Sequence, residues 1–146
     1  MSLKIFVTAI TYSLACSLAC LLVVACSGKP GGGEAVAVAG NAMHGEELYT
    51  QCQACHKLTE NFVGPHHCGL IGRPAGSVPD FEYSEAMKAS GLTWTPKTLD
   101  EFLTSPIAYV SGTKMGFAGF DSASDRADVI TWLVQANADP AVCPKS

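Results

Sequence analysis

Cys52-Gln53-Ala54-Cys55-His56 is the stretch from which the rest of the chain can be interpreted. Two thiols three residues apart, followed at once by an imidazole, form the attachment pattern for a c-type haem. Each thiol can add across one vinyl group at the porphyrin edge, and the next side chain then falls beneath the ring, where it can bind iron. Because the pattern occurs once, we expect one haem c, bound covalently through Cys52 and Cys55, with His56 on the iron.

Two other chemistries also use a CxxC pair. A zinc site needs two more ligands at knuckle spacing, and the remaining Cys and His residues form no second CxxC or HxxxH pair. A thioredoxin-like redox motif needs a βαβ pattern around it, which the sequence lacks. The spacing therefore favours haem attachment over both.

The first 25 residues are typical of an export signal, because Lys4 is followed by an uncharged, largely apolar run over 5–25. Val23-Val24-Ala25-Cys26-Ser27 resembles the lipobox of bacterial lipoproteins, in which the Cys becomes the lipidated first residue. An uncleaved membrane anchor is the alternative, since about 20 apolar residues can span a bilayer. Either form places the rest of the chain on the periplasmic side, and acyl chains on Cys26 would anchor it to the membrane.

Glycine and other small residues follow Cys26, beginning with Ser27-Gly28-Lys29-Pro30-Gly31-Gly32-Gly33, and no hydrophobic periodicity survives there. The sequence therefore predicts a lipoprotein-type signal over 1–25, a flexible tether over 26–40 and one domain over 41–146. A chain of 146 residues has room for one such domain.

The cysteines outside the haem motif support an exported protein. Cys16 and Cys20 leave with the signal and Cys26 takes the lipid. Cys68 and Cys143 then remain. An even remainder in an oxidising compartment suggests a disulfide. It would close a loop of about 75 residues and stabilise the fold by roughly 4 kcal/mol on the chain-entropy model. Two unrelated buried thiols are the alternative.

The chain is acidic, with a formal net charge of −4 that becomes one unit more negative when Lys4 is removed with the signal. Haem propionates would add further negative charge. A nucleic-acid partner is therefore not expected.

Helix signals recur after the tether, and no alternating strand pattern does. Asn41 can cap a helix running into Cys55, and Thr95-Pro96 is a cap followed by proline at the first helical position, with Pro106 as the stop. Segment 63–74 is rich in breakers and is expected to be a loop. Shorter or later helices are expected over 84–90 and after Ser122. In the last of them Ile130, Leu133, Val134 and Asn137 share a face, with Val129 and Trp132 alongside. The predicted class is all-α and loop-rich, packed around the haem.

The second axial position of the iron has several candidate ligands: Met43, Met87, Met115, His44, His66 and His67. Met115 stands apart because glycines at 112 and 116 let the backbone approach the haem ring and turn. A thioether ligand would favour ferrous iron and raise the reduction potential. His66 and His67 follow His56 by only about ten residues, so we expect their loop to stay on the His56 side.

These features resemble a class I cytochrome c of the mitochondrial and bacterial c2 type, over about 45–134. Besides the haem motif, the resemblance includes Val63-Gly64-Pro65, Gly69-Leu70-Ile71-Gly72-Arg73, Phe81-Glu82-Tyr83-Ser84, Gly91-Leu92-Thr93-Trp94, Gly112-Thr113-Lys114-Met115 and Arg126-Ala127-Asp128. It implies a small fold in which the last helix crosses the first. It also implies roles for particular residues: Met115 as distal ligand, the Pro65 carbonyl as acceptor for His56, Phe117 over the Met-side haem edge, and Arg73, Tyr83 and Trp94 around a haem propionate.

The chain also departs from that family. His67 lies where the mitochondrial members place an apolar residue against the ring, and Ser111 replaces a usual proline. The segment between Gly45 and Cys52 is one residue short, which could shift the contact of the first helix with the last. The acidic charge contrasts with the basic mitochondrial proteins.

The implied function is electron transfer by a monomeric, non-enzymatic carrier. Its partners would be a quinol-oxidising complex, a terminal oxidase or a periplasmic dehydrogenase, met by a positive rim formed by Lys57, Lys88 and Lys114. A haem-based sensor or peroxidase-like enzyme with an open or exchangeable sixth site is the alternative from another class. A carrier with two histidine ligands, using His44 or His67, is a third possibility.

Overall fold

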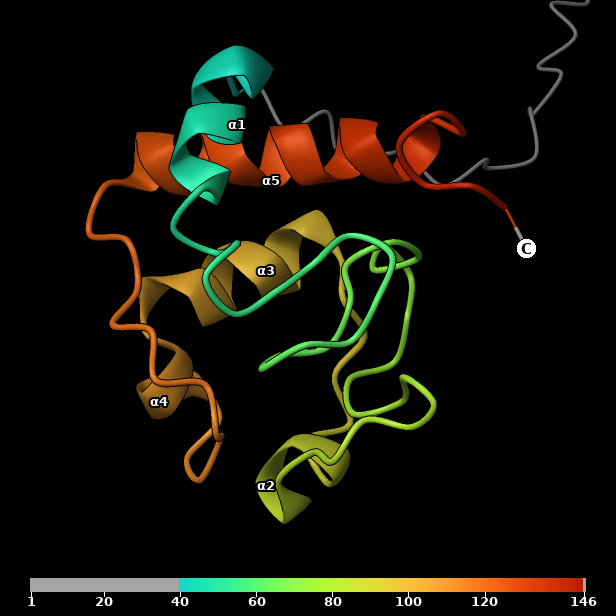
Figure 1. The fold of residues 1–146 in the computed structure, drawn as a ribbon. Coiled ribbons are helices and arrows are strands. Elements are labelled where there is room, and N and C mark those ends of the chain that lie inside the picture. The colour runs from blue at the N-terminus through green and yellow to red at the C-terminus, as the bar shows by residue number, and fades with distance from the viewer. Residues whose placement is uncertain (1–39, 146) are drawn as a thin grey trace, which may run out of the picture. The chain divides into compact units, whose positions relative to one another are not determined.

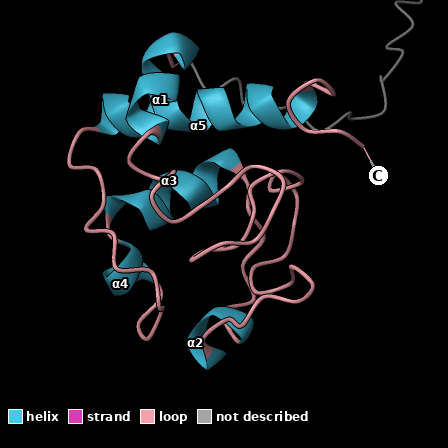
Figure 2. Ribbon diagram, viewed as in Figure 1, coloured by secondary structure: helices cyan, strands magenta, loops and turns pink. Residues whose placement is uncertain are grey.

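Helices joined by long loops make up residues 40–145, the part of the chain that the computed structural model describes (Figure 2). The elements in this part are α1 (Ala42–Tyr49), α2 (Glu85–Lys88), α3 (Pro96–Thr104), α4 (Pro106–Tyr109) and α5 (Ala123–Ala138). Its β structure is limited to one isolated bridge between Pro74 and Thr93. The all-α, loop-rich class is thereby confirmed.

The predicted signal over 1–25, the lipid site at Cys26 and the tether as far as residue 39 lie outside the described residues. Within 40–145, no helix has both the length and the apolar character that a bilayer crossing requires.

Asn41 caps α1 as expected, since its side-chain oxygen accepts hydrogen bonds from the backbone N–H groups of Met43 and His44. The prediction that this helix continues to Cys55 is wrong, because α1 ends at Tyr49. The Thr50 hydroxyl donates to the Glu47 carbonyl at 2.6 Å, which competes with the helical ladder. The chain then proceeds through tight turns, in which the next N–H groups bond three residues back.

Thr95 caps α3 and Pro96 occupies its first turn, as the sequence predicts. The cap is a capping box, because the Thr98 side chain bonds back to Thr95. Pro106 does more than end this helix, because it also begins α4. Proline is tolerated there since the first N–H of a helix has no intrahelical partner. The sequence pattern did not indicate this second short helix.

Helix α5 packs against α1 on one side and α3 on another, and Figure 1 shows α1 crossing it. The burial expected for α5 is confirmed at Val129, Ile130 and Leu133, and it extends further than expected, to Ala136. Val134 is only partly buried. A helix between two neighbours must be apolar around more of its circumference than a surface helix.

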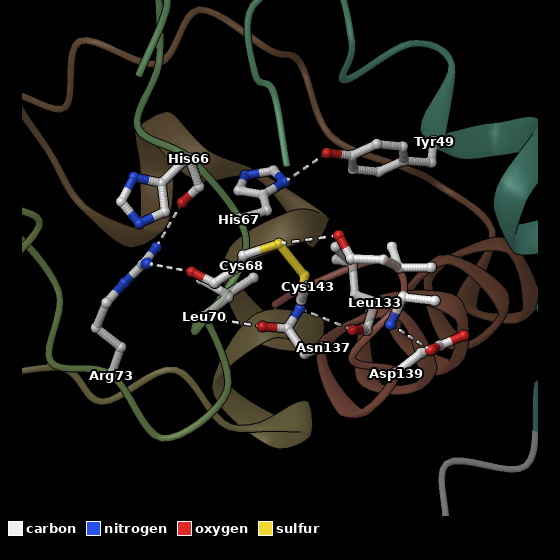
Figure 3. The surroundings of a disulfide bond; sticks show 12 residues. Tyr49, His66, His67, Cys68, Leu70, Arg73, Leu133, Asn137, Asp139 and Cys143 are labelled. Carbon is white, nitrogen blue, oxygen red and sulfur yellow. Dashed lines mark hydrogen bonds between the residues drawn. A yellow bond between two sulfur atoms is a disulfide. The ribbon is translucent and has the colours of Figure 1, made fainter. Parts of the chain in front are cut away.

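The buried core joins these three helices to α2 and the intervening loops. Its members are Tyr49, Leu70, Met87, Trp94, Leu99, Phe102, Leu103, Val110, Phe120, Val129, Ile130 and Leu133. The loop over 63–74 is tied to the end of the chain by two links (Figure 3). Cys68 and Cys143 form a disulfide across a sequence separation of 75, and the Asn137 side chain accepts from the Leu70 N–H at 2.8 Å.

Candidate functional site

His56 is buried, and one of its two ring nitrogens is already committed. Its Nδ1 lies 2.7 Å from the Pro65 carbonyl oxygen, so Nδ1 carries the hydrogen and donates it. Nε2 is then the nitrogen with the lone pair, which is the form that binds a metal. Burial lowers the pKa of His56, which favours this neutral form. The local geometry thus favours a neutral imidazole whose Nε2 lone pair is available to a metal.

Gly64 lets the loop pass flat against the His56 ring. A Cβ at this position would overlap the ring, so no other residue fits without movement. The Gly64 N–H also donates to the Cys55 carbonyl at 2.7 Å, which ties the loop to the end of the haem motif. Sequence reasoning did not assign Gly64 a role, although its place directly before Pro65 was a usable signal.

Cys52 and Cys55 are free thiols on the turn that precedes His56. The Cys52 side chain is partly buried, and burial raises its pKa to about 11, whereas Cys55 is exposed. The Cys52 carbonyl accepts from the His56 N–H at 2.8 Å, so one turn presents both thiols and the imidazole. This donor set fits a haem c attachment, and it does not fit a zinc site without further ligands.

Partly buried apolar side chains pack against the core and are available to contact a haem ring: Leu58, Ile71, Leu92, Met115 and Phe117. Met115 lies in the loop after α4, and its N–H donates to the Thr113 hydroxyl at 3.2 Å. Gly112, at φ 92°, provides a backbone turn that other residues rarely adopt.

The remaining candidate ligands lie in several different settings. The His67 ring stacks on His56 with a centroid separation of 4.2 Å, which places it on the His56 side as predicted. His44 bonds to Asp128 at 2.8 Å, and Met43 is 73% exposed on α1. Met87 belongs to the buried core.

Arg73, expected near a propionate, donates to two carbonyls of its own loop, those of Cys68 at 3.0 Å and His66 at 2.8 Å (Figure 3). Its backbone carbonyl accepts from the Trp94 N–H at 3.0 Å, which brings Arg73 and Trp94 together. Tyr83 is near enough to Arg73 for the two groups to affect each other's pKa. The guanidinium has further N–H groups with which to bind an anion.

Phe117 packs edge-on against Phe120, with ring centroids 5.0 Å apart. The lysines of the expected rim each have a local contact: Lys57 lies over the Phe62 ring at 5.1 Å, Lys88 pairs with Glu85, and Lys114 donates to the Glu82 carbonyl. The rim remains a prediction.

No family model matches the chain, but individual proteins do. It is 48% identical over 98 residues to "Cytochrome c2" of Rhodomicrobium vannielii, covering 65% of this chain and 78% of that protein. It is 50% identical over 98 residues to "Cytochrome c-type cyt cy" of Rhodobacter capsulatus, covering 66% of this chain and 49% of that protein.

Among solved structures, cytochrome cH from Methylobacterium extorquens matches with a TM-score of 0.64 and 38% identity, over 66% of this chain and 99% of that one. The shared fold, the level of identity and the geometry around His56 agree with one another. The chain belongs to the class I cytochrome c family.

Proposed function

We propose that this chain is a periplasmic, membrane-tethered carrier of single electrons that holds one haem c through Cys52 and Cys55, with His56 and Met115 on the iron. The observation that carries the proposal is the His56 ring, whose Nδ1 donates to the Pro65 carbonyl at 2.7 Å beside two free thiols. This arrangement leaves Nε2 free for a metal and makes the imidazole a stronger electron donor.

When bound, haem c supplies an iron that alternates between the ferric and ferrous states. His56 and Met115 would occupy both axial positions and so leave no site for a substrate, which is why we expect a carrier and not an enzyme. The Met115 thioether favours the ferrous state relative to a second imidazole. Buried apolar side chains around the site would keep water from the iron.

Arg73, Tyr83 and Trp94 would supply hydrogen-bond donors to a propionate, because a carboxylate taken out of water needs them. Phe117 would cover the haem edge on the Met115 side. We assign the roles to these residues from the family resemblance and from the proximity of the first three.

The tether over 26–40 and the lipid on Cys26 would hold the monomer at a membrane, where its partners are found. Electrons would pass between redox proteins such as a quinol-oxidising complex, a terminal oxidase or a periplasmic dehydrogenase. The lysine rim would steer an acidic partner in a salt-dependent manner.

The ligation is tested with Met115→Ala in the haem-loaded chain. Wild-type ferric protein at pH 7 should show the weak long-wavelength absorption of methionine bound to iron, and the variant should lose it and bind CO readily when reduced. Met43→Ala is the matched control, because Met43 is 73% exposed on α1. It should retain the band.

If wild type and Met115→Ala have the same ferric spectrum and both bind CO, the sixth position is open. The sensor or peroxidase-like function would then replace electron transfer as the best account of the site.

A further inference from the structure

A second histidine contacts the proposed iron ligand directly. The rings of His67 and His56 stack with a centroid separation of 4.2 Å and an interplanar angle of 23°. The Tyr49 hydroxyl lies 3.0 Å from His67 Nδ1, so it can donate to that nitrogen when the proton is on Nε2 (Figure 3). His67 thus has a partner at its edge and His56 against its face.

Tyr49 is itself immobilised. Its side chain is only 1% exposed, and its ring lies 4.1 Å from the ring of Trp132 on α5. A buried tyrosine hydroxyl needs a hydrogen-bond partner, and His67 is the one that the structure provides. The orientation of the His67 ring is therefore determined by the packing of α1 on α5.

The backbone around His67 is held just as firmly. The His67 N–H donates to the Lys57 carbonyl at 3.0 Å, and the Cys68 N–H donates to the Leu58 carbonyl at 2.7 Å. Cys68 is in turn bonded to Cys143. These links join the residues just after His56 to the loop carrying His67, so the two rings cannot easily separate.

The neighbouring His66 provides a contrast. Its Nδ1 lies 3.0 Å from the Asn61 side-chain oxygen, so its ring bonds within its own loop, whereas the His67 ring stacks on His56. His67 thus places a polar ring against the proposed axial ligand, where an apolar side chain is expected from the family.

We propose that His67, oriented by Tyr49, is a positioning residue that fixes the plane of the His56 ring and stabilises the ferric state. The proposal rests on His56 being an axial ligand, as in the proposed function. Groups that contact a metal-binding side chain determine how that side chain is oriented and how strongly it donates electrons to the metal. The plane of an imidazole ligand governs its overlap with the iron orbitals, and a polar neighbour favours the more highly charged oxidation state.

The test uses the haem-loaded chain with His67→Leu, His67→Phe and Tyr49→Phe, and His66→Leu as the matched control. Two readouts are compared: the hyperfine shifts of the haem methyl protons in the ferric protein, which depend on the imidazole plane, and the midpoint potential. His67→Leu should change the methyl shifts and raise the potential. His67→Phe keeps a ring that can stack but loses the hydrogen bond to Tyr49, so it should change the methyl shifts and raise the potential. His66→Leu should change neither.

Tyr49→Phe should alter the methyl shifts without a change in the residue at position 67, because the His67 ring loses its partner. Wild-type shifts and potential in both His67→Leu and Tyr49→Phe would overturn the role of His67. If His67→Leu does not fold, wild-type methyl shifts in both His67→Phe and Tyr49→Phe would overturn the proposal instead. Absence of the methionine–iron band in wild type would instead overturn the proposed ligation, so the two failures are distinguishable.

Discussion

His44 and Asp128 join α1 to α5 through one side-chain pair. His44 Nδ1 lies 2.8 Å from one Asp128 oxygen, and the other oxygen accepts from the Asn41 N–H at 2.6 Å. Hydrogen bonding to Asp128 raises the pKa of His44, and the same bond lowers the pKa of Asp128. The pair is at the surface, so its contribution should depend on pH and salt more than on packing.

The sign of the pH dependence follows from the direction of the shifts. Because folding raises the pKa of His44, its stabilisation is fully present below the ordinary value of 6.5 and is lost as pH rises through the raised value. The depressed pKa of Asp128 preserves the pair on the acid side until pH falls through that lower value.

We therefore expect the difference in unfolding free energy between wild type and His44→Ala to be largest near pH 6 and to shrink toward pH 9, both values being approximate. Denaturant titrations of the haem-loaded protein across this range would measure it. A difference that does not vary with pH would mean that His44 contributes through packing alone.

Helices α1 and α5 lie in close contact at Gly45. A Cβ there would overlap the Asp128 carbonyl oxygen, which belongs to the backbone of α5 and cannot rotate away. The shorter segment between Gly45 and Cys52 therefore does not prevent close contact between the first and last helices.

Gly45→Ala should destabilise the protein by about 1–3 kcal/mol, the usual cost of overpacking, because the two helices must separate. Alanine normally stabilises a helix relative to glycine, so any loss must come from the crossing. Glu46→Ala, at the exposed next position of α1, is the control and should stay within about 0.5 kcal/mol of wild type. Equal stability of Gly45→Ala and wild type in denaturant titrations would show that the helices can move apart at little cost.

The long segment between α1 and α2 has no helix of its own and is held by links to distant parts of the chain. The Arg73 guanidinium donates hydrogen bonds to two carbonyls of this segment, and the Asn137 side chain accepts one from the Leu70 N–H. The disulfide connects Cys68 to Cys143, which lies beyond α5. A segment without regular backbone bonding depends on such links because otherwise it retains the entropy of an open loop.

Removing the disulfide with Cys68→Ser and Cys143→Ser together should lower the unfolding free energy by about 2–5 kcal/mol. Guanidinium titrations with and without a thiol reductant would measure it. Reductant should destabilise wild type to the same extent and leave the double variant unchanged, because haem thioethers are not cleaved by thiols. A wild-type curve that is insensitive to complete reduction would contradict the prediction.

The sequence by itself determined the features that depend on near neighbours. The spacing Cys52, Cys55, His56 indicates the cofactor, since attachment chemistry requires those groups at that interval. Asn41 and Thr95-Pro96 mark helix starts, because capping bonds span two or three residues. The breakers over 63–74 indicate a loop for the same local reason.

Tertiary structure decided whatever depends on contacts between residues far apart in the chain. It buried α5 on two sides, against α1 and against α3. It also set His67 against His56 with Tyr49 at its edge. No local pattern could indicate these arrangements, because each is set by which surfaces meet when distant segments pack.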